Sequence, residues 1–252
     1  MSTQTRTLNP AAVTTILCDA DGNLFPSEEI AFEASVGVTN DLAAELGIEE
    51  RFNSEQLRLA TTGKNFRTLA GELSAGTGQW GTPKHELSQE DLERWIAEEK
   101  RVVSDYLNKR LKPDADVVEV LGTLAQSYGL AVVSSSALSR LHKCFEATDL
   151  EQFFAPERVF SAEDSLPTPV SKPDPAVYLK AIEELGLTAG ETLAIEDSLP
   201  GAQSAVAAGC QVVGNLRFVA PAEREQRRRE LEEAGVAAVI GSWPELLELL
   251  RG

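Results

Sequence analysis

A short apolar run near the amino terminus strongly constrains what this chain can fold into. Residues 13–18 end abruptly at Asp19, and Asp21 and Gly22 follow directly. This layout is typical of a buried parallel strand, whose carboxyl end delivers side chains to the ligand crevice of an open α/β sheet. Two carboxylates this close together repel each other and are costly to bury without a cation or a proton. A hard cation with oxygen ligands, such as Mg²⁺, is suited to hold them ionised, so the sequence predicts a magnesium site here.

Further strand-like stretches recur along the chain and alternate with helical patterns. Helical patterns cover 114–128 and 175–185, and we expect Gly129 to end the first at its C′ position and Asp174 to cap the second. This alternation predicts an α/β fold with a doubly wound parallel sheet. The strand-like stretches are residues 130–133, 192–195 and 211–213, with weaker candidates at 159–160 and 237–240.

Residues 27–108 break this alternation. They hold helical patterns, among them 65–73 and 89–107, and no convincing strand. We therefore predict a discontinuous α/β core formed by residues 1–25 and 109–252, with a helical domain inserted at residues 26–108.

Charge and composition exclude several classes of partner. The net charge is −17, from 23 basic and 40 acidic residues. This argues against nucleic acid or an anionic membrane as the main partner. No apolar run approaches the length of a membrane span, and residues 1–10 lack the apolar segment of a signal peptide. We expect a soluble, cytoplasmic protein, by default a monomer, and interpret the charge-dense segment 223–233 as a solvated helix.

Polar side chains follow several predicted strands at the point where each strand ends. A parallel sheet would bring these ends into one crevice. They include a carboxylate nucleophile, a second acid, hydroxyl donors, an ammonium and metal-binding carboxylates, which are the groups that phosphoryl transfer needs. The clusters, in chain order, are Asp19 with Asp21, Ser134 with Ser135 and Ser136, Lys172, and Glu196 with Asp197.

The order and spacing of these motifs resemble the haloacid-dehalogenase-like superfamily, and most of all its β-phosphoglucomutase-like branch. The resemblance implies a Rossmann-like core with an inserted α-helical cap. It also implies that Asp19 attacks phosphorus and forms an aspartyl-phosphate, and that Asp21 protonates the leaving oxygen and then activates water. In this interpretation Ser134 and Lys172 hold the phosphoryl oxygens.

The resemblance also implies a set of ligands. Mg²⁺ would be held by Asp19, by the main-chain carbonyl of Asp21, by Asp197, and by Glu196 directly or through water. Ser135 is a further phosphate-binding candidate. The segment 57–67 resembles the substrate-specificity loop of the branch, where the candidates for substrate binding are Thr62, Lys64 and Arg67.

Two observations favour hydrolysis of a small phosphorylated metabolite, such as a sugar phosphate. The dehalogenases of the superfamily lack the second aspartate, which is present here as Asp21. The mutase branch is expected to carry a histidine about ten residues after it, but residues 30–33 read Ile-Ala-Phe-Glu. A sugar-phosphate mutase and a non-catalytic phosphate-binding protein on the same fold stay open as alternatives.

Two further residues are unusual. Asn23 stands where the family motif more commonly has threonine. Arg140 lies in the first turn of a predicted helix, where a cation opposes the helix dipole, so we expect it to have a partner.

Overall fold

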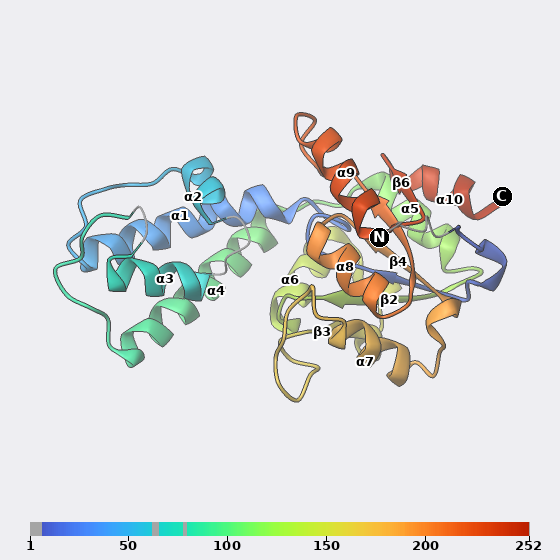
Figure 1. Cartoon of the computed structure of the whole chain (residues 1–252), viewed down its shortest axis with the longest axis horizontal. Helices are drawn as coiled ribbons and strands as arrows, with labels where there is room; N and C mark the ends of the chain where they lie inside the picture. The colour runs from blue at the N-terminus through green and yellow to red at the C-terminus, as the bar shows by residue number, and fades with distance from the viewer. Residues whose placement is uncertain (1–6, 62–65, 78–79, 252) are drawn as a thin grey trace. The chain divides into compact units, whose positions relative to one another are not determined.

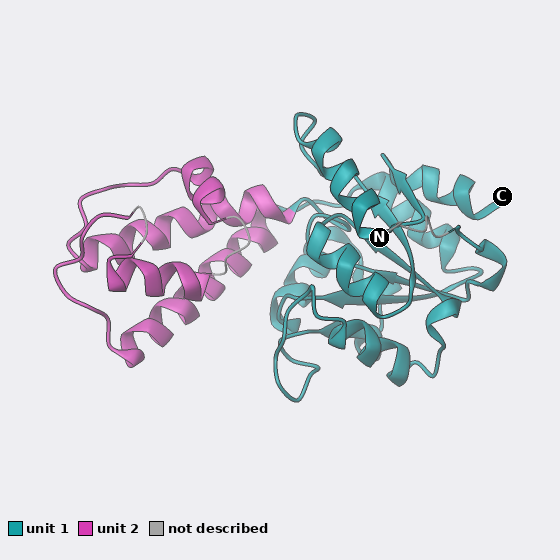
Figure 2. Cartoon of the chain, viewed as in Figure 1, with its two compact units in different colours: residues 1–26, 111–252 teal, residues 27–110 magenta. Residues whose placement is uncertain are grey.

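The computed structural model describes residues 7–61, 66–77 and 80–251 (Figure 1). The chain forms two compact units, one made of Met1–Pro26 with Leu111–Gly252 and the other of Ser27–Arg110 (Figure 2). The first unit holds a parallel sheet, and the second holds helices, with no strand among its described residues.

The sheet of the first unit has six strands in the order β3-β2-β1-β4-β5-β6, all parallel. Its central strand β1 is fully buried, as expected for a short apolar run covered by helices on both faces. The predicted doubly wound parallel sheet is thus confirmed. The strands are β1 (Thr15–Cys18), β2 (Gly129–Ser134), β3 (Val159–Ser161), β4 (Thr192–Glu196), β5 (Gln211–Asn215) and β6 (Ala238–Ile240).

Helices cover both faces of this sheet. Leu17 of β1 packs in one core with side chains from α7, α8 and α9. Ile16 and Cys18 point to the opposite face, because side chains alternate along a strand, and they are also fully buried. The helices of this unit are α5 (Ala115–Leu124), α6 (Leu138–Thr148), α7 (Ala176–Glu184), α8 (Leu199–Ala207), α9 (Arg224–Ala234) and α10 (Trp243–Arg251), with short 3-10 helices η1 (Pro10–Ala12), η2 (Glu151–Phe153), η3 (Pro156–Arg158) and η4 (Ala189–Glu191).

Two predicted helix ends differ from the structure. Helix α5 ends at Leu124, and Gly129 is the first residue of β2, so its assignment as a C′ glycine is wrong. The intervening residues form a turn, and the Gly129 amide donates to Thr14, which draws the glycine into the sheet. Helix α7 begins at Ala176, and the Asp174 carboxylate still accepts from the Ala176 amide at 2.9 Å.

Among its described residues, the second unit has four helices around its own apolar core. Asn53 caps α2 in a capping box with Gln56, and the Ser88 hydroxyl accepts from the Asp91 amide at the start of α4. The four helices are α1 (Ser27–Glu45), α2 (Ser54–Ala60), α3 (Phe66–Ala75) and α4 (Gln89–Arg110). Across the described parts of the chain, no helix combines the length and the apolar content needed to cross a membrane.

Candidate active site

The carboxyl ends of the two central strands bring three acids together. Cys18 at the end of β1 pairs with Ile195 of β4, so Asp19 lies level with Glu196 and next to Asp197. Each of these acids offers a carboxylate oxygen, and the three oxygens lie within 4.8 Å of one another. All three residues are buried, so their negative charges meet in an environment that screens them poorly.

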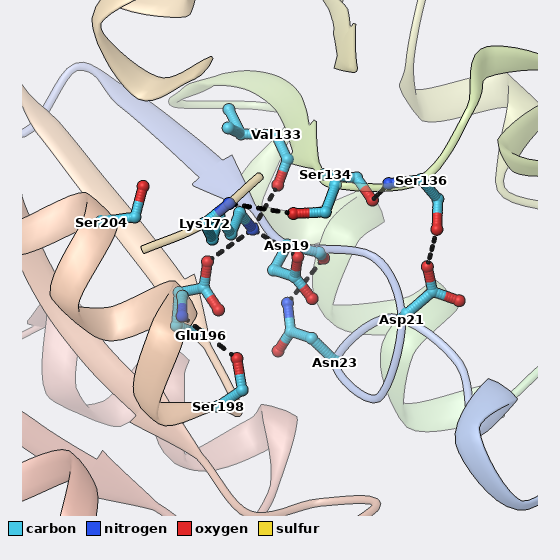
Figure 3. A network of polar contacts seen from close by, with 12 residues as sticks. Asp19, Asp21, Asn23, Val133, Ser134, Ser136, Lys172, Glu196, Ser198 and Ser204 are labelled. Carbon is cyan, nitrogen blue, oxygen red and sulfur yellow. Dashed lines mark hydrogen bonds and ion pairs between the residues drawn. The ribbon is translucent and has the colours of Figure 1, made fainter. Parts of the chain in front are cut away.

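Lys172 provides the positive charge inside this acidic cluster (Figure 3). Its ammonium donates to Asp19 at 2.5 Å, to Glu196 at 2.7 Å and to the main-chain oxygen of Val133 at 2.8 Å. These contacts use all three N–H groups of the ammonium. Burial alone would lower the pKa of Lys172, but the two carboxylates outweigh it and raise the pKa above its ordinary value. Lys172 is therefore a fixed cation at the carboxyl end of β1.

The pKa values of two of these acids are raised by their surroundings. Burial, the largest effect, raises the pKa of Asp19 to about 7, and Lys172 opposes part of that rise. Burial, followed by the charges of Asp19 and Glu196, raises the pKa of Asp197 well above its ordinary value. The Oε2 atom of Glu196 is buried and accepts no hydrogen bond from the described residues. A cluster of carboxylates with an unused oxygen fits a hard divalent cation such as Mg²⁺.

Tyr178 of α7 completes the surroundings of Glu196 and was missed by the sequence analysis. Its hydroxyl donates to Glu196 Oε1 at 2.6 Å, and Lys172 Nζ lies 5.2 Å from the centre of its ring. Tyr178 is fully buried. Helical periodicity places it on the core-facing side of its helix but gives no sign that its hydroxyl binds a carboxylate.

The start of α8 does not use the carboxylate of Asp197 as its N-cap. The Ser198 hydroxyl is the N-cap and accepts from the Gly201 amide at 3.2 Å. The capping function therefore falls on the serine, and the carboxylate of Asp197 stays directed at the cluster. On the other side of this helix start, Gly201 lies directly against the carboxylate of Glu196.

We expect replacement of Gly201 by alanine to destabilise the protein, although alanine is the better helix former. The added Cβ would overlap Glu196 Oε2, and this carboxylate is held in place by Lys172 and Tyr178. The expected loss is about 1–3 kcal/mol, as for other overpacked sites. Urea denaturation measures it, with Gly190→Ala as the control, because a Cβ there meets nothing within 4 Å. Equal stability of the two variants would show that Glu196 can move aside.

The carboxylate of Asp21 lies apart from the acidic cluster, on the side of the segment that follows β2. It accepts from the Ser136 hydroxyl at 2.6 Å and pairs with Arg140 at 2.8 Å, so the expected partner of Arg140 is found. The Ser134 hydroxyl is buried and accepts from the Ser136 amide at 3.1 Å. The Ser135 hydroxyl accepts from the main-chain amide of Lys172 at 3.4 Å.

Asn23 joins the ends of the two central strands. Its side-chain amide donates to the main-chain oxygens of Asp19 at 2.8 Å and Ile195 at 3.2 Å. Its side-chain oxygen accepts from Asn215 at 2.8 Å, and its main-chain oxygen accepts from the indole of Trp243 at 3.1 Å. A threonine side chain has no amide with which to make this set of bonds, so the departure from the commoner motif residue has a structural role here.

Helix α9 reaches the site through Arg227. This side chain donates to the main-chain oxygen of Asp197 at 2.7 Å, and Nη1 lies 3.9 Å from Asp197 Oδ2. Leu231 of the same helix is fully buried. The interpretation of segment 223–233 as a solvated helix is therefore wrong for the face that carries Arg227 and Leu231. The dense charge of the segment concealed these two residues.

The substrate-binding candidates of the second unit are only partly described. Thr62 and Lys64 lie outside the described residues. Arg67 is exposed in α3, and its guanidinium pairs with Glu93 of α4 through bonds of 2.5 and 2.7 Å. A role for these three residues in substrate binding stays a prediction.

Known proteins share sequence with this chain over most of its length. Residues 16–215 match the family model described as haloacid dehalogenase-like hydrolase. Hexitol phosphatase B of Escherichia coli K12 is 30% identical over 194 residues, covering 76% of this chain and 78% of that protein. Protein CbbY of Rhodobacter capsulatus is 27% identical over 200 residues, covering 79% of this chain and 83% of that protein.

A solved structure shares the fold over nearly the whole chain. CbbY from Rhodobacter sphaeroides in complex with phosphate has a TM-score of 0.69 at 22% identity, covering 93% of this chain and 96% of that one. The family match extends from β1 to the end of β5 and so includes every strand end that carries an acid of the cluster. This chain is a member of the haloacid dehalogenase-like hydrolase family.

Proposed function

We propose that this chain is a Mg²⁺-dependent phosphatase that hydrolyses a small phosphorylated metabolite, such as a sugar phosphate, through an aspartyl-phosphate on Asp19. The observation that carries the proposal is the buried ammonium of Lys172, held between Asp19 and Glu196 at the carboxyl end of the central strand. It supplies a fixed positive charge where a phosphoryl group would meet the Asp19 carboxylate. The name of hexitol phosphatase B and the phosphate complex of CbbY support this substrate class.

Asp19 and Lys172 would act together in the first step. A carboxylate oxygen of Asp19 attacks phosphorus, and the bond from phosphorus to the leaving oxygen breaks. Lys172 offsets the repulsion between the carboxylate and the phosphoryl oxygens, and Ser134 donates to one of these oxygens. Contacts of this kind are each worth about 2–4 kcal/mol when they act on charge that develops in the transition state.

Asp21 would move the protons in both steps. Its carboxyl group gives a proton to the leaving oxygen as Asp19 is phosphorylated. In the second step it takes a proton from the water that attacks the aspartyl-phosphate, and free phosphate and the Asp19 carboxylate are restored. The two roles require one group that can first give and then accept a proton.

The cation is assigned to the acidic cluster described above. Asp19, Asp197 and the main-chain oxygen of Asp21 would hold it, with Glu196 contributing directly or through water. When bound, Mg²⁺ supplies positive charge that neutralises the carboxylates and the phosphoryl oxygens. The Oε2 atom of Glu196, which has no hydrogen-bond partner among the residues that the structure describes, and the raised pKa values of Asp19 and Asp197 support this assignment.

The helical domain at residues 26–108 is proposed to be a cap that encloses the substrate and excludes water during turnover. In this arrangement Thr62, Lys64 and Arg67 would select the substrate through its hydroxyls or a second anionic group. A Lys64→Ala variant that keeps the full catalytic efficiency on the preferred substrate would remove Lys64 from this role.

Metal removal tests the proposed function. We expect the protein to release phosphate from p-nitrophenyl phosphate with Mg²⁺, to lose this activity in EDTA, and to regain it when Mg²⁺ is added in excess. A panel of sugar phosphates, assayed for both phosphate release and isomer conversion, then identifies the reaction. Conversion without release would point to a mutase, and phosphate binding without turnover to a non-catalytic protein.

A further inference from the structure

Two side chains from the segment after β2 hold the carboxylate of Asp21, one on each oxygen. The Ser136 hydroxyl donates to Oδ2 at 2.6 Å, and the Arg140 guanidinium donates to Oδ1 at 2.8 Å. Figure 3 shows Asp21 pointing toward Ser136 and away from Lys172 and Glu196. Donors on both oxygens fix the rotation of the carboxyl group as well as its position.

Both donors are themselves held in place. The Ser136 amide donates to the Ser134 hydroxyl at 3.1 Å, which fixes the turn after β2. At the start of α6, the Leu138 amide donates to the Asp164 carboxylate at 2.6 Å, which fixes the helical turn that carries Arg140. The site therefore has a rigid support for one orientation of the Asp21 carboxyl group.

The position of Arg140 is unfavourable for the helix that carries it. It lies in the first turn of α6, where the partial positive charge of the helix end repels a cation. Helix stability does not explain a guanidinium in this place. The ion pair with Asp21 explains its position. The side chains of Arg140 and Asp21 are each 27% exposed, and a partly buried ion pair is less screened than a pair on the surface.

We propose that Arg140, together with Ser136, is a positioning residue that orients Asp21 for proton transfer to and from the reacting oxygens. This inference rests on the proposed phosphatase function. A carboxylate has about four lone-pair positions, so hydrogen bonds from Ser136 and Arg140 are compatible with a proton on the same group. In this role Arg140 acts through Asp21 and does not itself contact the substrate.

The dependence of the rate on the leaving group tests this role. Phenyl phosphate and p-nitrophenyl phosphate have nearly the same shape, but phenolate needs a proton as it leaves much more than nitrophenolate does. Loss of a positioned acid therefore slows the hydrolysis of phenyl phosphate more than the hydrolysis of p-nitrophenyl phosphate. We expect Arg140→Gln to lower kcat/KM for phenyl phosphate about tenfold to a hundredfold more than for p-nitrophenyl phosphate, part of the 10²–10⁴ that acid–base groups contribute. Asp21→Asn should show the same selectivity more strongly.

Two further variants test whether the effect is specific to the guanidinium of Arg140. Arg140→Lys keeps the charge and should recover part of the loss on phenyl phosphate. Arg229→Gln is the matched control, because Arg229 is an exposed arginine of the same unit, paired with Glu225, and should leave both rates unchanged. If Arg140→Gln does not fold, the Arg140→Lys comparison with the wild type still decides, through a smaller loss confined to phenyl phosphate.

The outcomes separate this inference from the function on which it rests. An equal loss on both substrates, a rise in KM alone, or no loss would overturn the positioning role while the phosphatase stands. Failure of the wild type to release phosphate from either ester in Mg²⁺ would overturn the proposed function and this inference with it.

Discussion

Replacement of Asp19 by asparagine is expected to abolish phosphate release while the protein stays folded. Asparagine keeps the shape of the side chain but cannot attack phosphorus as a carboxylate. The expected fall in kcat is at least about 10⁴-fold, within the range seen when an enzyme loses its nucleophile. Steady-state phosphate release measures the loss, and single-turnover assays with labelled substrate measure phosphate bound to the protein.

The fold should tolerate this change because Asp19 is a buried acid whose charge is costly. Burial raises its pKa to about 7, so a neutral amide avoids part of the penalty that the carboxylate pays in the metal-free protein. Asp41→Asn, an exposed change in α1, is the control and should keep full activity. If Asp19→Asn and Asp19→Ala both hydrolyse phosphoesters at the wild-type rate, Asp19 is not the nucleophile.

Replacement of Lys172 by methionine is expected to reduce both stability and activity. The change keeps most of the side-chain volume but leaves Asp19 and Glu196 buried without their shared cation. Breaking a buried pair by removing one partner typically costs about 3–5 kcal/mol. Urea denaturation of the metal-free protein measures this loss of stability. Phosphate release should fall at the same time, because the charge that offsets the phosphoryl oxygens is gone.

A matched control separates this effect from the loss of any lysine. Lys180 pairs with Glu184 on the surface of α7, and Lys180→Met should leave the stability nearly unchanged. Adding Mg²⁺ to the Lys172→Met variant should recover part of its stability, because a bound cation again balances the carboxylates. Equal stabilities of the two metal-free variants would mean that Asp19 and Glu196 share a proton and do not depend on the ammonium.

The strand ends could be predicted from the sequence because each apolar run stops at a polar residue. Asp19, Ser134 and Glu196 follow or end three such runs, and the parallel sheet brings them to one edge. Lys172 lies in a loop without periodicity, so only its place in the order of the motifs indicated that it would lie in the same crevice as Asp19. The local sequence pattern was therefore sufficient to predict the place of a site residue where a strand positions its side chain.

Contacts between residues far apart in sequence could not be predicted in this way. Tyr178 has the spacing of an ordinary core residue, and nothing local indicates that its hydroxyl meets Glu196. Arg227 lies among many charges, so its contact with Asp197 was not distinguishable from a solvated position. For Arg140 the signal was the mismatch between its charge and the helix dipole, which indicated a partner without identifying it.

The position of β1 in the middle of the sheet has a consequence for how the chain folds during synthesis. Thr15 pairs with Gly129 on one side and with Thr192 on the other, so both neighbours of the first strand are made much later. The strand therefore leaves the ribosome unpaired and stays so until its neighbours are synthesised. The helices of Ser27–Arg110 can fold in the meantime, because their contacts are more local. Until β2 and β4 emerge, the apolar segment that ends in Asp19 has no strand to pair with and is exposed to aggregation and to capture by chaperones.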